Sequence, residues 1–452
     1  MGKKIQVRPE YAEAFRCINS ACEDICCGGW KVVIDQPGYE KLQALPTGPL
    51  RTLIDASILV TPKNADSNDT GPPIFARIVM NESNQCPMLS AELLCRIHSE
   101  FGEAALAHVC ATFPRIVHSI GATSEKALAL SCPEAARLVL LNPHLLEPHL
   151  SEPVRSRTTL VEQSGYRAEA SWLPPSFWPV REAVLALILD RDYTLWQRMF
   201  LLGVMCRQLD AIAAQELSCS VQEFLADFHA TVNAAELTAQ MDAMPVDPAD
   251  PRIQLDAVGR LAGLMLRRSY LRPRYVQCLN EFTAGIGNTP GATLESLAAR
   301  YTLAHDDFFA PFFGRHPHIL ENFLINTILR CQFPYGRDGM KEKGATSMTR
   351  EFALLTAQYA LMKGLLIGVA GFHREQFSTE HVVRTVQAAT KHFDHHPEFL
   401  NLAHELLVER GLNTPLGLTI LIRNAASHEV EDRPSSTALQ VPALETPVET
   451  PA

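Results

Sequence analysis

The chain carries one thiol-rich stretch near its N-terminus, Cys17-Ile18-Asn19-Ser20-Ala21-Cys22-Glu23-Asp24-Ile25-Cys26-Cys27-Gly28-Gly29-Trp30. Four cysteines lie within eleven residues of this stretch, and two of them are adjacent. Four more follow before residue 133, so the first third of the chain holds eight of its twelve cysteines. In a reducing compartment, clustered cysteines are more often metal ligands or redox groups than structural disulfides. The thiol density therefore predicts a bound metal ion or metal cluster.

The spacing of the first four cysteines, CxxxxCxxxCC, matches neither the paired CxxC units of a zinc ribbon nor the common ferredoxin runs. A loop of this length can still place three thiolates around one site, with a fourth supplied by a later cysteine. Adjacent side chains of an extended backbone point in different directions, so we expect Cys26 and Cys27 to share one ion only with difficulty. Either one of this pair is structural, or the eight cysteines form more than one site.

The spacing favours an iron-sulfur cluster over zinc, and zinc stays open as the second choice. Eight free thiols packed as small hydrophobic residues are the remaining alternative. The candidate metal ligands are Cys17, Cys22, Cys26, Cys27, Cys86, Cys95, Cys110 and Cys132.

Composition is that of an ordinary soluble protein. With 452 residues, the chain can bury a large core and divide into two or more domains. Hydrophobic residues make up 47% and charged residues 20%. A net charge of -10 and a pI near 5.9 argue against a nucleic-acid-binding protein with a broad basic surface.

No targeting or membrane-spanning segment is expected. The N-terminus is charged and lacks the apolar region of a secretory signal. The most apolar segment, Leu361 to Ala370, is interrupted by Lys363 and is too short to span a bilayer. These features predict a cytoplasmic protein without membrane insertion.

Residues 1–142 are expected to form a small cysteine-rich domain with a few short strands. The pattern predicts a helix at 11–15, strands at 31–35 and 74–80, a helix at 39–45 and a surface loop at 61–73. Apolar residues then recur at helical spacing from residue 89 to Cys110, with Ser90 as a plausible N-cap. A further helix is expected after Cys132, with Pro133 in its first turn.

The fold class is therefore mainly α, because the rest of the chain has helical periodicity without strand alternation. A proline-rich linker is expected at 143–179, an all-α domain at 180–425 and a disordered tail at 426–452. The expected helices of the large domain are 180–189, 195–217, 221–244, 253–268, 293–301, 318–330, 346–369, 379–392 and 397–410.

Several short motifs resemble those of the flagellin lysine-N-methylase family, in which a CxxxxCxxxCC block is followed by Gly and Trp. In this family Tyr commonly precedes the Pro-Arg pair of the third matching motif, where this chain has Phe113. The cysteine motif is also shared with a wider group of zinc- or iron-chelating proteins. The motifs that carry the resemblance are Cys17 to Trp30, Cys86-Pro87-Met88-Leu89, Leu94-Cys95-Arg96-Ile97, Gly102-Glu103, Cys110, Phe113-Pro114-Arg115, Ser131-Cys132-Pro133-Glu134, Glu321-Asn322-Phe323-Leu324, Phe333-Pro334-Tyr335 and Gly371-Phe372-His373.

The resemblance implies an enzyme that binds an iron-sulfur cluster of the 4Fe-4S type and methylates lysine side chains of flagellin. S-adenosylmethionine is the implied methyl donor, and flagellin is the implied protein partner. Composition and spacing do not themselves indicate methyl transfer. No donor-binding motif is evident, because alternating strands and helices are missing and Gly285 to Gly291 is better explained as a loop between helices. The catalytic base, the donor-binding residues and the oligomeric state are not predicted.

Three other groups of residues have competing interpretations. The run His392-Phe393-Asp394-His395-His396 could bind a metal, but solvated residues at a helix end are favoured. A solvated helix end is likewise favoured over a patch that binds an acidic partner for the basic residues Arg267, Arg268, Arg272 and Arg274. Bracing of the cysteine site is the favoured role for Arg115, and contact with the substrate is the alternative.

Two functions from different classes remain open at this stage. One is a cluster-containing lysine methyltransferase that acts on flagellin. The other is a non-enzymatic zinc- or iron-binding adaptor, in which the cysteines stabilise the fold and the helical domain docks a protein partner.

Overall fold

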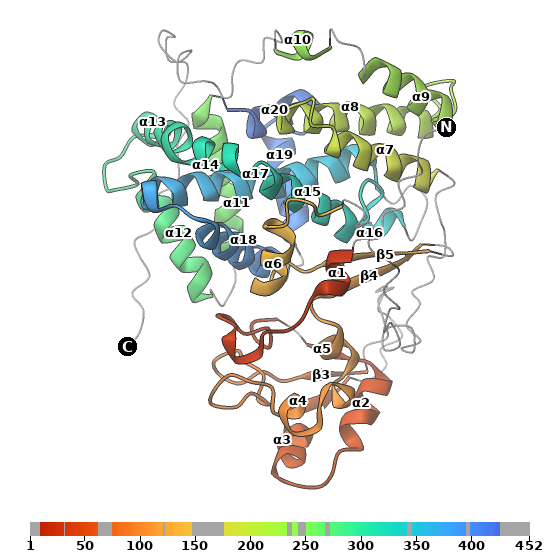
Figure 1. The fold of residues 1–452 in the computed structure, drawn as a ribbon, viewed down its shortest axis with the longest axis vertical. Helices are drawn as coiled ribbons and strands as arrows, with labels where there is room; N and C mark the ends of the chain where they lie inside the picture. Colours follow the sequence, from red (N-terminus) through yellow and green to blue (C-terminus); the bar gives the residue numbers. More distant parts are fainter. Residues whose placement is uncertain are drawn as a thin grey trace. The chain divides into compact units, whose positions relative to one another are not determined.

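The computed structural model describes residues 10–30, 32–61, 75–120, 123–146, 176–232, 237–242, 250–266, 272–340, 346–394 and 398–424. These residues form two compact units (Figure 1). The N-terminal unit contains the described residues up to 139 and 144–146, and the helical unit contains 140–143 and the described residues from 176 onward. Residues 147–175 of the predicted linker and the predicted tail 426–452 lie outside the described residues, so the domain boundaries stay predictions.

The N-terminal unit combines short strands with short helices, as expected. A three-stranded antiparallel sheet has the order β1-β3-β2, and a second sheet is the hairpin β4-β5. The elements are α1 (Glu10–Ala14), η1 (Asn19–Ala21), β1 (Val33–Ile34), α2 (Gln36–Gln43), α3 (Pro49–Ser57), β2 (Ile58–Val60), β3 (Ala76–Ile78), α4 (Arg96–Phe101), η2 (Glu103–Ala105), α5 (His108–Thr112), β4 (Arg115–Ile120), β5 (Thr123–Leu128) and α6 (Pro133–Leu140).

A small hydrophobic core holds the three-stranded sheet against its helices. In β3 the side chains of Ala76 and Ile78 are buried while Arg77 is exposed, which is the alternation of a strand with one covered face. Asp35 caps α2 by accepting a hydrogen bond from the Gly38 amide at 3.2 Å. The buried core residues are Val32, Ile34, Leu42, Leu50, Ile54, Ala76, Ile78, Cys86, Met88, Ile97, Leu106 and Ala107.

The single helix expected between residue 89 and Cys110 is wrong. Ser90 forms a turn instead of a helix N-cap, because its Oγ accepts from the Glu92 and Leu94 amides at 3.2 and 3.3 Å. Leu93 has φ +60° and is 47% exposed, and Gly102 has φ +79°. These turns divide the segment into α4, η2 and α5, and they place Cys95 and Cys110 on different elements.

The helical unit contains only helices among its described residues, which confirms the mainly α fold. Its elements are α7 (Phe177–Leu189), α8 (Leu195–Ala213), α9 (Val221–Val232), α10 (Leu237–Asp242), α11 (Pro251–Leu266), α12 (Pro273–Gly285), α13 (Leu294–Ala304), the π-helical turn η3 (His305–Phe309), α14 (Ala310–Arg315), α15 (His318–Arg330), α16 (Gly336–Gly339), α17 (Met348–His373), η4 (Arg374–Gln376), α18 (Thr379–Phe393), α19 (Phe399–Glu409) and α20 (Pro415–Ile422).

Helix α17 is the centre of the helical unit. Its residues from Phe352 to Ala370 are all buried, and it contacts α8, α11, α12, α13, α15, α18, α19 and α20. The helix is long and apolar enough to cross a membrane, but its apolar window is buried completely inside the unit. Such burial is typical of the core helix of a soluble protein. The Nζ atom of Lys363, inside this helix, donates to the Ile422 carbonyl at 2.6 Å, and burial lowers the pKa of Lys363 to about 7.

Glycines allow α12 and α17 to approach closely. A Cβ atom at Gly285 would lie within 2 Å of the Gly368 carbonyl oxygen, and one at Gly368 would clash with Phe282. The atoms nearest to a Cβ at Gly285 are all backbone atoms, so none of them can move aside as a flexible side chain would.

Gly285→Ala is therefore expected to destabilise the protein by about 2 kcal/mol or more, since overpacking forces backbone shifts. Gly259→Ala in α11 is the matched control, because nothing lies within 4 Å of its Cβ position. Alanine should raise helix propensity there. Urea unfolding of the two variants measures both effects, and equal stability of the variants would contradict the packing argument.

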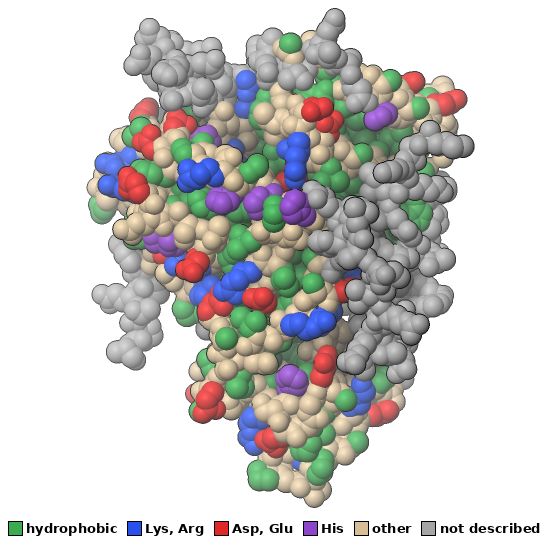
Figure 2. Space-filling model, in the orientation of Figure 1, with side chains coloured by type: hydrophobic (Ala, Val, Ile, Leu, Met, Phe, Trp, Pro, Cys, Tyr) green, Lys and Arg blue, Asp and Glu red, His purple; other side chains and the backbone are tan. Residues whose placement is uncertain are grey.

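Charged side chains are interspersed on the face of the molecule shown in Figure 2, where Lys and Arg lie among Asp and Glu. On the same face, several histidine side chains lie close together over the helical unit (Figure 2).

Candidate metal centre

All eight predicted cysteines lie among the described residues of the N-terminal unit, and all are free thiols. The thiol-rich loop is held by the backbone against the segment around Cys86. The Cys86 amide donates to the Cys27 carbonyl at 2.8 Å, and the Gly29 amide donates to the Asn84 carbonyl at 2.8 Å. The Trp30 indole donates to the Cys26 carbonyl at 2.8 Å. These bonds place the adjacent cysteine pair beside a residue almost sixty positions away.

Two short helices bring further thiols to the same region. Cys95 occupies the N-cap position of α4 and forms an isolated bridge with Leu89. Cys110 lies in α5. Cys27, Cys95 and Cys110 all pack against the hydrophobic core that contains Cys86. We call these four residues the Cys27 group.

Burial and neighbouring thiols raise the pKa values of the Cys27 group. The contact with Cys26 and burial raise the pKa of Cys27, and the Cys110 and Cys86 thiols raise it further. Burial raises the pKa of Cys110, with smaller contributions from Cys86, Cys95 and Cys26. Burial also raises the pKa of Cys86 to about 11. The four thiols therefore resist becoming thiolates together unless a positive charge lies among them.

Three of the four other thiols, Cys17, Cys22 and Cys132, form a second set that we call the Cys22 group. Burial raises the pKa of Cys132 to about 12, and the Cys22 and Cys26 thiols raise it further. Burial is also the main cause of the raised pKa of Cys22, to which the Cys17 thiol contributes. Cys132 stands directly before α6, where the positive end of the helix dipole favours a thiolate.

Cys26 connects the two groups, because its thiol contributes to the pKa shifts in both. The Sγ atoms of Cys26 and Cys27 are 3.6 Å apart. The expectation that adjacent cysteines point away from each other is wrong, because the loop is not an extended strand at this position. In the part of the chain that the structure describes, no three Cys, His, Asp or Glu side chains surround a position suited to one metal ion.

A small cavity opens beside the cysteine loop. Its volume is about 120 Å³. Glu23, on its wall, forms an ion pair with Arg137 of α6. The cavity is lined by Asn19, Ser20, Cys22, Glu23, Asp24, Ile25, Glu92, Leu93 and Leu94.

Arg115 braces the entry to the cysteine loop. Its Nη2 atom donates to the Phe15 carbonyl at 3.0 Å, and its guanidinium lies over the Phe15 ring, 5.1 Å from the centroid. Phe15 is two residues before Cys17. The contact ties β4 to the start of the thiol-rich stretch and agrees with the bracing role expected for Arg115.

The prediction that His392 lies at a solvated helix end is wrong. His392 is fully buried, its Nε2 lies 2.9 Å from the Met265 carbonyl, and its ring stacks on Tyr275 at 4.6 Å. Asp394 forms an ion pair with Arg330 at 2.6 Å. His395 and His396 lie outside the described residues. These contacts make His392 part of the packing among α11, α12 and α18.

The prediction of a solvated helix end is also wrong for Arg272 and Arg274. Arg272 is only 8% exposed, at the N-cap position of α12. Arg274 donates through Nε to Gln387 Oε1 of α18 at 3.0 Å. Both belong to the interior contacts of the helical unit, whereas Arg267 and Arg268 lie outside the described residues.

A buried carboxylate in the helical unit was not predicted from the sequence. Glu321 of α15 is 2% exposed and lies between two arginines. Arg198 Nη1 binds Glu321 Oε2 at 2.7 Å, and Arg191 Nη2 binds Oε1 at 2.8 Å. The pairs join residues more than a hundred positions apart, so no local sequence signal could reveal them.

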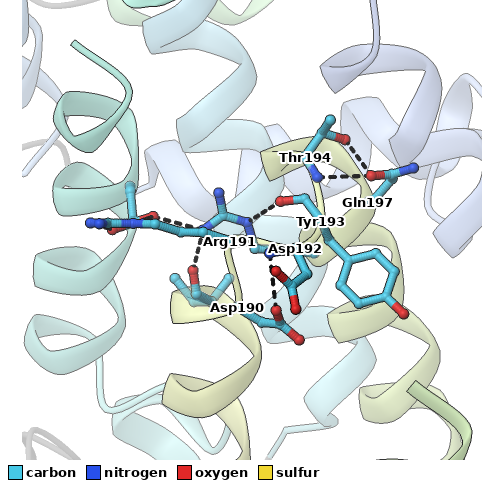
Figure 3. Close-up of polar contacts among 9 residues, drawn as sticks. Asp190, Arg191, Asp192, Tyr193, Thr194 and Gln197 are labelled. Atoms are coloured by element: carbon cyan, nitrogen blue, oxygen red, sulfur yellow. Dashed lines mark hydrogen bonds and ion pairs between the residues drawn. The ribbon is translucent and has the colours of Figure 1, made fainter. Parts of the chain in front are cut away.

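Arg191 lies in the loop between α7 and α8 (Figure 3), and Arg198 lies in the first turns of α8. Arg198 Nε also donates to the Tyr193 carbonyl at 3.0 Å, and Asp190 Oδ1 accepts from the Asp192 amide at 3.1 Å. The Thr194 amide donates to Gln197 Oε1 at 2.8 Å, which completes a capping box at the start of α8 (Figure 3). The network connects the loop between α7 and α8 to α15.

Comparisons with known proteins identify the family. The chain is 25% identical over 414 residues to a lysine-N-methylase of Salmonella typhimurium, covering 89% of this chain and 95% of the relative. It is 25% identical over 414 residues to a lysine-N-methylase of Salmonella choleraesuis, with the same coverage. It is also 33% identical over 142 residues to the flagellar biosynthetic protein FliU of Salmonella muenchen, covering 31% of this chain and 80% of the relative.

No solved structure matches the chain. The family model for the FliB lysine N-methylase C-terminal domain matches residues 181–421, which are more than half of the chain and lie in the helical unit. The chain therefore belongs to the FliB lysine N-methylase family, a family of lysine methyltransferases.

Proposed function

We propose that this chain transfers methyl groups from S-adenosylmethionine to lysine side chains of flagellin in the cytoplasm, with an iron-sulfur cluster held by its N-terminal cysteines. The observation that carries the proposal is the similarity, over nearly the whole chain, to proteins named lysine-N-methylase. Flagellin as the substrate is supported by the relative named flagellar biosynthetic protein FliU. The twelve free thiols are compatible with a reducing cytoplasm.

The donor set of the N-terminal unit fits a metal cluster. Burial and mutual repulsion raise the pKa values in both cysteine groups, and a bound cationic centre reverses this effect because a coordinating thiol is deprotonated outright. The residues that would hold the cluster come from the Cys27 group, the Cys22 group and Cys26. Four thiolates suffice for a 4Fe-4S cluster.

Zinc is the alternative to a cluster, and one pair of thiols has the spacing that a single zinc ion requires. Two thiolates on one tetrahedral zinc lie about 3.8 Å apart, given a Zn–S distance of about 2.3 Å. Cys26 and Cys27 have this spacing, but no third ligand completes a single-ion position among the described residues. In a 4Fe-4S cluster each cysteine binds a different iron, so the ligands stand farther apart than Cys26 and Cys27 do, and only one of this pair would bind the cluster.

A cluster at this place would cross-link several separate segments of the N-terminal unit. The ligand candidates lie on the thiol-rich loop, on the segment of Cys86, at or within α4 and α5, and directly before α6. The unit has short strands and a small core, so metal binding would contribute directly to its folding. When bound, an iron-sulfur cluster can also supply one-electron chemistry.

For methyl transfer, the substrate lysine must first lose the proton on its amine. A lysine amine with a pKa of about 10.4 is mostly protonated at neutral pH and cannot attack a methyl group. The site must therefore desolvate the amine or accept its proton, and must align the nitrogen with the methyl carbon and the sulfonium sulfur. The chain's negative net charge favours the approach of both a cationic donor and a lysine side chain.

Co-expression with flagellin tests the proposed substrate. The chain is produced with flagellin, and separately with another lysine-rich protein, in a host that lacks its own flagellin methylase. Mass spectrometry of lysine peptides is expected to show methylation of flagellin alone. Binding of flagellin without methylation, by protein that retains its iron, would support the adaptor function instead.

A further inference from the structure

A cluster of ionisable side chains joins three helices of the helical unit. It contains Glu281 of α12, His373 at the end of α17, and His381 and Arg384 of α18. His373 Nε2 lies 3.1 Å from Glu281 Oε2, and the Arg384 guanidinium binds the same oxygen. The His373 side chain is 17% exposed and that of Glu281 is 8% exposed. Protons from solvent can therefore reach a cluster that otherwise lies within helix packing.

His381 fastens the first turn of α18. Its Nδ1 atom accepts a hydrogen bond from the Ser378 amide at 3.1 Å, and the Ser378 side chain bonds the backbone of His381 in return. This is a capping box in which an imidazole occupies the position usually held by Glu or Gln. An imidazole nitrogen accepts only while it is unprotonated. The cap therefore requires His381 to be neutral.

The second histidine makes protonation of His381 still less favourable. The two imidazole rings stack with their centroids 3.7 Å apart and an interplanar angle of 24°. Phe377 stacks on His381 at 6.1 Å and supplies no charge. Burial lowers the pKa of His381, the charges of His373 and Arg384 lower it further, and Glu281 and Glu380 oppose the effect.

The surroundings of His381 oppose a positive charge on its ring. A proton on His381 would face the Arg384 guanidinium and the stacked His373 ring. It would also remove the acceptor for the Ser378 amide and place a positive charge at a helix N-terminus. Protonation of His381 is therefore expected to weaken the cap of α18.

We propose that the His373 and His381 pair is a pH-sensitive latch, which holds the N-terminus of α18 at neutral pH and releases it when His381 is protonated. The latch concerns packing of the helical unit and does not depend on the proposed methyl transfer. It contributes stability above the ordinary histidine pKa of about 6.5 and loses it as the pH falls through the lower pKa of folded His381.

Hydrogen exchange measured by mass spectrometry tests the latch in the full chain. After correction for intrinsic rates, protection of the first turn of α18 in the wild type is expected to fall about tenfold or more between pH 7.5 and pH 5. His381→Gln keeps a capping acceptor without a titrating group, so its protection should not change over this range. His98→Gln, an exposed histidine of the N-terminal unit, is the matched control and should behave like the wild type.

His373→Gln is a second variant for the same experiment, and it does not alter the cap that Ser378 and His381 form. Removing the neighbouring imidazole should make His381 easier to protonate, so the loss of protection should shift to higher pH. Equal protection of the wild type at both pH values would overturn the latch. So would a His381→Gln variant that loses protection on acidification as the wild type does, or a His373→Gln variant with an unshifted transition.

Discussion

Cys26→Ser is expected to lose most of the bound iron and the lysine methyltransferase activity. Cys26 is the thiol shared by the Cys27 and Cys22 groups, so its removal affects whichever set holds the cluster. Replacing a residue that only supports metal ligands typically lowers metal affinity 10- to 100-fold, so loss of a ligand should cost about 100-fold or more. Iron and sulfide analysis of anaerobically purified protein, together with its visible absorption spectrum, measures the effect.

Cys219→Ser is the control for this experiment. Cys219 is an exposed free thiol of the helical unit and has no part in the cysteine groups. The variant should retain wild-type iron, sulfide and activity. Full iron content in Cys26→Ser would remove Cys26 from the ligand set, whereas equal loss of iron in both variants would indicate a general sensitivity of the protein to cysteine replacement.

Glu321→Gln is expected to destabilise the helical unit by about 3 kcal/mol, because it leaves the Arg198 guanidinium buried without its carboxylate. The side chain of Arg198 is 9% exposed, and that of Glu321 is 3% exposed. Breaking such a pair costs more than the pair itself contributes, since the remaining charge stays desolvated. Urea unfolding monitored by circular dichroism gives the difference in unfolding free energy.

Arg191→Gln is the matched control, because Arg191 binds the same carboxylate but its side chain is 57% exposed. An exposed partner contributes less than about 1 kcal/mol. If the two variants lose equal stability, burial of Arg198 is not the cause of the effect, and the network in Figure 3 acts in some other way.

The larger part of the fold follows from helical periodicity in the sequence. The helices predicted at 318–330 and 379–392 correspond closely to α15 and α18, because their apolar faces pack against α17 or its neighbours. Four α-helices of the helical unit were not predicted, namely α12, α14, α16 and α20, of which α12 and α20 are the longest. α12 begins at Pro273 in a polar segment, and α20 is a short helix that is apolar on all sides. In both, contacts with other helices of the unit outweigh local patterning.

The N-terminal unit shows where local patterns mislead. Apolar spacing between residues 89 and 110 resembles a helix, but the Ser90 turn and the positive φ of Gly102 break it. The hairpin of β4 and β5 was missed, although Ile116, Val117 and Ile120 gave a β-branched signal before a glycine. In this unit, the residues that form turns determined the path of the chain more strongly than the spacing of the apolar residues did.

The sequence predicted which cysteines belong to the candidate metal centre but not how they are arranged in the fold. Cysteine spacing pointed to all eight thiols, whereas their division into two groups that share Cys26 depends on backbone pairing between distant segments. No comparable sequence pattern indicated the buried polar groups of the helical unit. His392 is buried by Tyr275 and Met265 of other helices, and Glu321 meets Arg198 across 123 residues of sequence.

The number of cysteines bound to the cluster bears on its role. Four cysteine ligands would leave no open iron and favour a cluster that stabilises the N-terminal unit, whereas three would leave one iron available to the reaction. The chain offers more thiols than either arrangement needs, so single replacements across the Cys27 and Cys22 groups can identify the ligands by iron content alone.

Transfer of label from methyl-labelled S-adenosylmethionine to purified flagellin tests the central claim most directly. The assay uses the full chain, purified without oxygen and with its iron and sulfide content measured beforehand. We predict label on lysine side chains of flagellin, in an amount that depends on the intact cluster. Absence of label on flagellin lysines, with the cluster demonstrably intact, would contradict the proposed function.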